Sequence, residues 1–523
     1  MFHLTLSCVL APLLHSQSPS LLSAVPDQAT AVARCANIGL LRDRMERNRW
    51  AQFMQTRTGK NLLLDFIGGA GNSDEFGKMA EIGSVLHGEC VLFASETTTG
   101  FLTTPPADVA TLKAAMQKWM PERSEEAMHS SQTMFGAQVD IMSWPGSGRR
   151  AGHVAAFVHH PQAFGLFSAN DAESLRQEMG ASLSKIGTDH RSRTVQRLET
   201  RRNQVGRPGL VEGYVDLSNP VFMMAGELTP GISVTERQVL GEGPVDLYAS
   251  LDIQPGSGLE MRGHLNVPPG SLASRFADCL RPLPPTLAGS IPNDSIAFAG
   301  LGIDFARGYA LTRKILEELE AKGTLTSLDQ GLALGQATSG VDLEQAVVRQ
   351  LTGPTALVVL DPGETTETLG MFGLPIFLTQ GLANGLDFQE AFEELVPMAG
   401  EFIRLELDDV HGVDVYQIVD TGMGIDGGIA FLPSAFLIAL NGDALLRAVA
   451  AGAGPPESGE PGPIPATLSG HPGVCGLSTV VMAPYWNRAM DGDEEAISIV
   501  TGAQITSTLR RTADGFELHL LAR

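Results

Sequence analysis

The sequence lacks the short motifs that identify most enzyme families. It contains no G-x-S-x-G nucleophile elbow, no H-E-x-x-H metal motif and no C-x-x-C pair. The segment 58–60 has no upstream glycine to complete a phosphate-binding loop. The glycine-rich segment 68–71 is not followed by a clear helix at the spacing of a dinucleotide-binding site. We therefore predict no catalytic and no cofactor-binding residues from the local sequence.

Positive charge is also scarce. The 523 residues include 36 Lys and Arg against 59 Asp and Glu, which gives a formal net charge of −23 and a pI of about 4.9. An acidic surface repels phosphate backbones and anionic lipid headgroups, so the composition argues against a nucleic-acid-binding protein. After the N-terminal region, no apolar stretch is long enough for a transmembrane helix.

The N-terminal region has the apolar pattern of an export signal. Residues 1–22 contain no Lys or Arg, and residues 2–14 are mostly apolar. A run of this length suits the hydrophobic region of a signal peptide and is too short to cross a bilayer. We predict a signal peptide over residues 1–20 and an extracytoplasmic protein, periplasmic or secreted. The alternative is a buried N-terminal strand or helix.

Cysteines are few. Removal of the signal peptide would remove Cys8 and leave Cys35, Cys90, Cys279 and Cys475. Cys35 and Cys90 both lie in apolar runs and would be able to pair if those runs are neighbours. Buried free thiols are the alternative. The sequence does not decide between disulfides and free thiols at these four positions.

The strongest positive feature of the sequence is an internal repeat. Five pairs of segments recur in the same order and at nearly the same separation. They are 25–27 with 291–293, 86–93 with 351–358, 169–176 with 440–447, 214–217 with 480–483, and 248–264 with 505–521. The separation is far longer than the period of a solenoid repeat. We therefore predict two tandem, duplicated modules.

Each module shows both helical and strand periodicity. Apolar spacing predicts helices within 38–57, 109–119, 170–183, 311–320 and 387–395. Strict alternation predicts a strand over 259–267, with Leu259 and Met261 on the packed face and Glu260 and His264 on the wet face. Residues 516–520 repeat this pattern, and residues 356–360 are apolar enough to be buried on both faces. Without regular βαβ alternation, these signals predict an α+β fold with mainly antiparallel sheets and packed helices.

Composition also suggests where the modules end. We predict a first module over 21–280, a Pro-rich join at 281–285 and a second module over 286–523. Within the second module, residues 452–473 are rich in Gly and Pro and are expected to form an exposed loop.

Clusters of ionisable residues offer weak candidates for chemistry. The best metal candidates are in the first module: Asp140, His153, His159, His160 and His190. Adjacent histidines on a strand point to opposite faces, which argues against a shared ion and leaves no predicted metal site.

Acidic segments of the second module are equally weak candidates. Residues 491–495 lack the register of a calcium loop. Asp408, Asp409 and His411 fall at a predicted turn, so we do not interpret them as part of a catalytic triad.

One stretch of the first module is basic. It contains Arg191, Arg193, Arg197, Arg201, Arg202 and Arg207. The two interpretations are a solvated helix and a docking site for an acidic or envelope-associated partner.

Several short segments resemble one group of proteins. These are Leu-Leu-Ser-Ala-Val-Pro-Asp at 21–27, followed by a helix with Arg44, Arg47 and Trp50, and the segments 339–344 and 351–353. Together they resemble uncharacterised exported bacterial proteins that share a domain of unknown function. The resemblance implies export and a two-part α+β body, and it provides no catalytic residues.

These observations favour a non-enzymatic extracytoplasmic protein that acts as a binding or structural module of the cell envelope. A second hypothesis is a carrier of a lipid or another apolar ligand, because a half-wet sheet and 18 Met suit an adaptable apolar groove. A third is a hydrolase whose site is assembled from distant segments.

Overall fold

The computed structural model describes most of the chain. The described residues are 20–53, 55–59, 82–117, 127–144, 153–217, 245–254, 258–318, 322–362, 375–397, 404–419, 427–454, 460–482 and 493–523. The predicted signal peptide up to residue 19, the segment 68–71 and residues 491–492 lie outside these ranges. The contacts divide the chain into two compact units, Met1–Leu228 with Pro244–His264, and Thr229–Gly243 with Leu265–Arg523.

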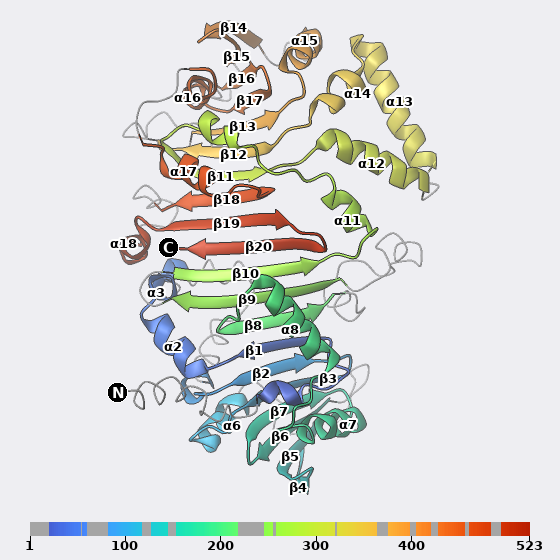
Figure 1. The fold of residues 1–523 in the computed structure, drawn as a ribbon, viewed down its shortest axis with the longest axis vertical. Coiled ribbons are helices and arrows are strands. Elements are labelled where there is room, and N and C mark those ends of the chain that lie inside the picture. The colour runs from blue at the N-terminus through green and yellow to red at the C-terminus, as the bar shows by residue number, and fades with distance from the viewer. Residues whose placement is uncertain are drawn as a thin grey trace, which may run out of the picture. The chain divides into compact units, whose positions relative to one another are not determined.

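The first unit is built on an antiparallel sheet (Figure 1). Its strands are β1 (Ala31–Cys35), β2 (Cys90–Ala94), β3 (Thr98–Thr103), β4 (Met128–Met134), β5 (Ala137–Trp144), β6 (His153–His160), β7 (Ala163–Ala169), β8 (Val211–Asp216), β9 (Asp246–Gln254) and β10 (Gly258–Asn266). Their order across the sheet is β10–β9–β8–β1–β2–β3–β7–β6–β5–β4.

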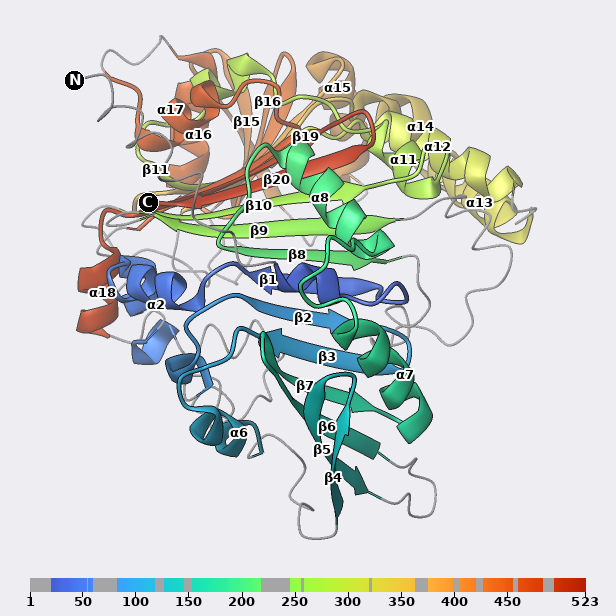
Figure 2. The same cartoon turned by 60° about the horizontal axis from the view of Figure 1, so that its bottom comes forward.

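Helices cover both faces of this sheet. They are η1 (Leu21–Ala24), α2 (Ile38–Glu46), α3 (Arg49–Phe53), α6 (Val109–Gln117), α7 (Ala172–Leu183) and α8 (Arg193–Val205). Figure 2 shows α7 and α8 along one face, where Met179 and Leu198 pack with Val91 and Phe167 in one core. Leu112 of α6 belongs to a second core with Cys90 and Phe157. The sheet therefore buries apolar side chains on both sides.

The second unit is also built on an antiparallel sheet. Its strands are β11 (Ser295–Leu301), β12 (Thr355–Leu360), β13 (Ile376–Gly381), β14 (Arg404–Val410), β15 (Val413–Val419), β16 (Gly428–Leu432), β17 (Ala435–Ala439), β18 (Gly476–Val481), β19 (Gln504–Arg511) and β20 (Gly515–Ala522). Their order across the sheet is β20–β19–β18–β11–β12–β13–β17–β16–β15–β14.

Within the described ranges, the second unit has more helices than the first. They are α11 (Leu272–Ala277), η3 (Pro285–Ser290), α12 (Phe305–Glu318), α13 (Lys322–Ser339), α14 (Leu343–Ala346), η4 (Val348–Gln350), α15 (Gly385–Leu395), α16 (Gly442–Ala453), α17 (Pro463–Gly470) and α18 (Glu494–Val500). The buried residues of α16 and α17, such as Leu445 and Ile464, form one core with β11, β12 and β17. Across both units, no described helix combines the length and hydropathy needed to span a bilayer.

The two units have the same strand order when β1–β10 are matched with β11–β20 in chain order. The hairpins β4–β5 and β14–β15 even share a tight turn. Phe135 and Gly136 have φ of 51° and 76°, and His411 and Gly412 have φ of 56° and 77°. Positive φ at both central residues is the geometry that joins antiparallel strands through a two-residue type I′ turn. The α+β class with mainly antiparallel sheets, which was predicted from the sequence, is confirmed.

Several predicted elements are present with different boundaries. Predicted helix 38–57 is two helices, α2 and α3. The helix predicted within 170–183 begins only after Asp171, whose carboxylate accepts the N–H groups of Glu173 and Ser174.

Three predictions about burial and loops were wrong. Leu357 of β12 is exposed, so this strand is not buried on both faces. Residues 463–470 of the predicted loop 452–473 form α17, since Pro463 is favourable in the first helical turn and Ile464 is buried. The Pro-rich segment 281–285, expected as the join, lies within the second unit, where Leu283 is buried and its N–H donates to Val474 O.

The wet and packed faces of β10 are the reverse of those predicted. Glu260 and His264 are buried, whereas Met261 is 37% exposed. The reason is charge pairing, because the guanidinium groups of Arg207 and Arg262 both bind the Glu260 carboxylate. A buried carboxylate is tolerated when it is paired in this way.

Candidate functional site

The basic stretch of the first unit binds carboxylates of its own sheet. Arg202 of α8 donates to both oxygens of Glu212 on β8, from Nε at 2.7 Å and Nη2 at 2.6 Å. Glu212 is 1% exposed, and it also accepts the Tyr248 hydroxyl at 2.9 Å. Arg34 of β1 lies 3.6 Å from the same carboxylate. This two-pronged pairing is the strongest geometry available to an arginine and a carboxylate.

Neighbouring arginines repeat the arrangement. Arg201 donates to both oxygens of the buried Asp246, at 2.8 and 3.1 Å. Arg197 binds Asp216 at 2.6 Å and the Tyr214 hydroxyl at 3.3 Å. The carboxylates that bind these arginines come from β8 and β9. The side chains are therefore not simply solvated, and they are not available to an external acidic partner.

Two tyrosines complete this network. Burial raises the pKa of Tyr214 to about 12, and burial together with the neighbouring Glu212 raises the pKa of Tyr248 further still. Both hydroxyls therefore stay protonated at any physiological pH. They act as hydrogen-bonding groups of the fold and are poorly suited to acid–base catalysis.

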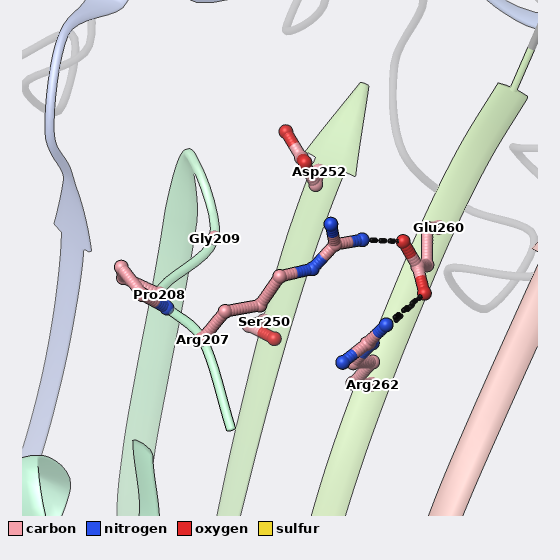
Figure 3. A pocket seen from close by; sticks show the side chains of 7 residues that line it. All are labelled: Arg207, Pro208, Gly209, Ser250, Asp252, Glu260 and Arg262. Carbon is pink, nitrogen blue, oxygen red and sulfur yellow. Dashed lines mark hydrogen bonds and ion pairs between the residues drawn. The ribbon is translucent and has the colours of Figure 1, made fainter. Parts of the chain in front are cut away.

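A small cavity lies at one end of the network (Figure 3). Arg207 and Arg262 point at the two oxygens of Glu260, with Ser250 and Asp252 beside them. The cavity volume is about 10 Å³, which is room for no more than a water molecule. This arrangement stabilises the sheet and leaves no space for a substrate.

The larger hollow belongs to the second unit and is apolar. Its volume is about 710 Å³, within the range of pockets that hold small ligands. The lining residues come from α11, α12, η4, the start of β20 and the segments beside them: Ala273, Phe276, Ala277, Cys279, Leu280, Ile303, Phe305, Gly308, Tyr309, Thr312, Val348, Leu351 and Phe516. Phe276 and Phe305 are each about 40% exposed, so the hollow is accessible from solvent.

Polar groups are confined to a few positions of this apolar pocket. The Tyr309 hydroxyl accepts a hydrogen bond from Arg313 at 3.0 Å and donates to Glu344 at 3.3 Å. Burial raises the pKa of the Cys279 thiol, so this side chain is a poor nucleophile. The pocket therefore has an apolar floor and a charged margin, a combination suited to binding an apolar molecule.

The histidines considered as metal ligands do not converge. His159 lies 3.8 Å from Asp140, which is bound more closely by Lys113 at 2.5 Å. His153 contacts Ser168 at 3.1 Å, and His190 contacts Lys185 at 2.9 Å. Within the described residues, no three potential metal ligands come together. Asp409 accepts the N–H of Gly412 at 3.2 Å, which agrees with a turn at this position.

The sequence analysis did not identify the apolar pocket. Its walls come from residues 273–280, 303–312, 348–351 and 516, and no local pattern links these segments. Only the exposure of two phenylalanines, Phe276 near the end of α11 and Phe305 at the start of α12, distinguishes the site, and exposure depends on the fold.

Comparisons with known proteins found one weak structural similarity. No known family matches the chain, and no curated protein is similar to it. One solved structure, that of crystal form I of TP0453, is similar over 48% of this chain and 80% of its own, with 11% identity and a TM-score of 0.26. A score this low supports no inference about fold or function.

Proposed function

We propose that this protein is a non-enzymatic extracytoplasmic binding protein of the cell envelope whose second unit holds an apolar ligand, such as a fatty acyl chain. The observation that supports this proposal is the accessible apolar pocket beside α11 and α12. Its lining is almost entirely aliphatic or aromatic, so transfer of an apolar chain from water into it would be favourable.

The hydrolase alternative receives less support from this pocket. Hydrolysis requires a nucleophile or an activated water beside a suitable base. Among the lining residues, the raised pKa of the Cys279 thiol works against a nucleophile, and the Tyr309 hydroxyl is occupied by Arg313 and Glu344. Binding without chemistry is therefore the better interpretation.

We also propose that the two units arose by tandem duplication. Three observations support it: the same strand order, the same type I′ turn in equivalent hairpins, and five pairs of similar segments in the same order. These segments fall on equivalent elements; for example, 86–93 leads into β2 and 351–358 into β12. The pocket of the second unit would then be a later specialisation, because its long helices α12 and α13 have shorter counterparts, α2 and α3, among the described residues of the first unit.

Removal of one pocket side chain tests the binding proposal. We expect Phe305→Ala to weaken binding of the fluorescent fatty acid cis-parinaric acid by about tenfold, because loss of one aromatic contact costs on the order of 1.4 kcal/mol or more. Fluorescence titration measures the affinity directly. Leu334→Ala is the matched control, since Leu334 on α13 is 69% exposed and does not line the pocket. Equal affinities for the two variants, or no binding by the unaltered protein, would refute the proposal.

The N-terminal prediction has its own test. We expect the protein to be recovered outside the cytoplasm without its first residues, processed near residue 20, as the apolar run at 2–14 and the resemblance to exported proteins suggest. Mass spectrometry of the N-terminal peptide after cell fractionation provides the measurement. Cytoplasmic protein that retains the full apolar segment would contradict it.

A further inference from the structure

Two cysteines of the first unit face each other across neighbouring strands. Cys35, the last residue of β1, is the direct register partner of Cys90, the first residue of β2. Cys90 belongs to the core that includes Leu112 of α6, and Cys35 packs against that same core. Both side chains therefore lie on the same face of the sheet, as expected for directly opposed residues of an antiparallel pair.

The backbone hydrogen bonds show that Cys35 and Cys90 are a hydrogen-bonded pair and not a non-hydrogen-bonded pair. The N–H of Ala36 donates to Leu210 O at 2.9 Å, and the N–H of Asp216 donates to Thr30 O at 2.8 Å. The even-numbered residues of β1 therefore bond to β8, and odd-numbered residues such as Cys35 bond to β2. Such hydrogen-bonded pairs have Cα atoms about 5.5 Å apart. That separation lies within the range of Cα distances that disulfides span.

We propose that Cys35 and Cys90 form a reversible cross-strand disulfide, a modification site that closes the segment 36–89 into a covalent loop. Both thiols are free in the structure, which represents the reduced form. The site is specific to the first unit, because the equivalent register pair of the second unit is Leu301 with Thr355. The inference does not depend on the apolar pocket of the second unit.

The chemistry requires a disulfide-containing oxidant, such as oxidised glutathione or an oxidised dithiol protein. Cys35 is half-buried and Cys90 is buried, so the thiolate of Cys35 attacks the oxidant first. This step forms a mixed disulfide and releases one thiol. Cys90 then loses its proton and attacks the Cys35 sulfur, which releases the second thiol. The protein loses two protons and two electrons, and the oxidant is reduced to two thiols.

The rate of this exchange follows from burial. Burial raises the pKa of Cys35, and it raises the pKa of Cys90 to about 12. The Cys90 thiol also donates to Thr103 Oγ1 at 3.1 Å. Thiolate is scarce at neutral pH, so oxidation is slow and accelerates as pH rises.

Alkylation and peptide mapping test the proposal on the full chain carrying Cys8→Ser. After incubation with oxidised glutathione and denaturation, we expect Cys35 and Cys90 to lose reactivity toward a maleimide together and to appear in one cross-linked peptide. Cys279 and Cys475 lie in the second unit and are not register partners. They should still react with the maleimide and serve as internal controls. After proteolytic cleavage within 36–89, the fragments should separate on a gel only when a reductant is present.

Single Cys35→Ser and Cys90→Ser variants give the matched comparison. In each, the remaining cysteine should be recovered as a free thiol or as its glutathione adduct, without the cross-linked peptide. The parent chain could instead accumulate a stable glutathione adduct on Cys35 while Cys90 still reacts with the maleimide. In that case no disulfide forms between the two cysteines and the proposal is wrong. Continued alkylation of both thiols at high pH would overturn it equally.

Discussion

Glu212→Ala is expected to lower the free energy of unfolding of the first unit by about 3–5 kcal/mol, the usual cost of removing one partner of a buried ion pair. The substitution leaves the Arg202 guanidinium without its two-pronged acceptor and the Tyr248 hydroxyl without its acceptor at 2.9 Å. These groups would remain in a sheet face that excludes water. Urea unfolding followed by circular dichroism measures the change.

The same helix provides the control for this prediction. Glu199 of α8 pairs with Arg191 at 3.2 Å, but both side chains are more than a third exposed. Exposed pairs contribute at most about 1 kcal/mol, so Glu199→Ala should shift the urea midpoint only slightly. If the two variants unfold at the same urea concentration, the buried arginine–carboxylate network does not hold α8 on the sheet.

Phe431→Ala is expected to destabilise the second unit by about 3–5 kcal/mol, the range for removal of a buried aromatic ring. Phe431 on β16 is buried, and its ring lies 5.1 Å from Phe392 and 5.6 Å from Tyr416, measured between centroids. Phe388, also on α15, lies 6.2 Å away. Removal of this ring would leave a cavity between α15 and the sheet, which thermal unfolding would report as a lower midpoint.

Phe305→Ala is the natural comparison within the same unit. It deletes the same side chain from a position that is 40% exposed in the apolar pocket. A much smaller change in stability is expected there, because less apolar surface and fewer contacts are lost. The two substitutions thus separate a ring that supports the fold from a ring that is available to a ligand. Comparable destabilisation by both would mean that the pocket is part of the core.

The periodicity of apolar residues was a good guide to local structure. Apolar stripes at helical spacing predicted α6, α7 and α15, and the alternation at 259–267 and 516–520 predicted β10 and β20. These features depend on residues close together in the chain, so they can be recognised without knowledge of the fold. The same is true of the turn at His411, where the following glycine accommodates the positive φ.

Burial of charge could not be predicted in this way. Along β10, the alternation correctly separated an apolar side from a polar side, but it placed the polar side in water. Glu260 is instead buried, because Arg207 lies beside it in the fold although it is distant in the chain. The six arginines of the basic stretch were equally visible in the sequence. The partners of Arg201 and Arg202, Asp246 and Glu212, lie on β9 and β8, and only packing of α8 against those paired strands brings them together.

The sequence alone thus determined an acidic chain with an antiparallel α+β fold, because composition and periodicity are properties of neighbouring residues. Tertiary structure alone decided that the arginines of α8 serve the protein's own sheet, that Cys35 faces Cys90, and that four separate segments enclose an apolar pocket. Each of these depends on contacts between residues far apart in the chain, and such contacts exist only once the strands have taken their order in the sheet.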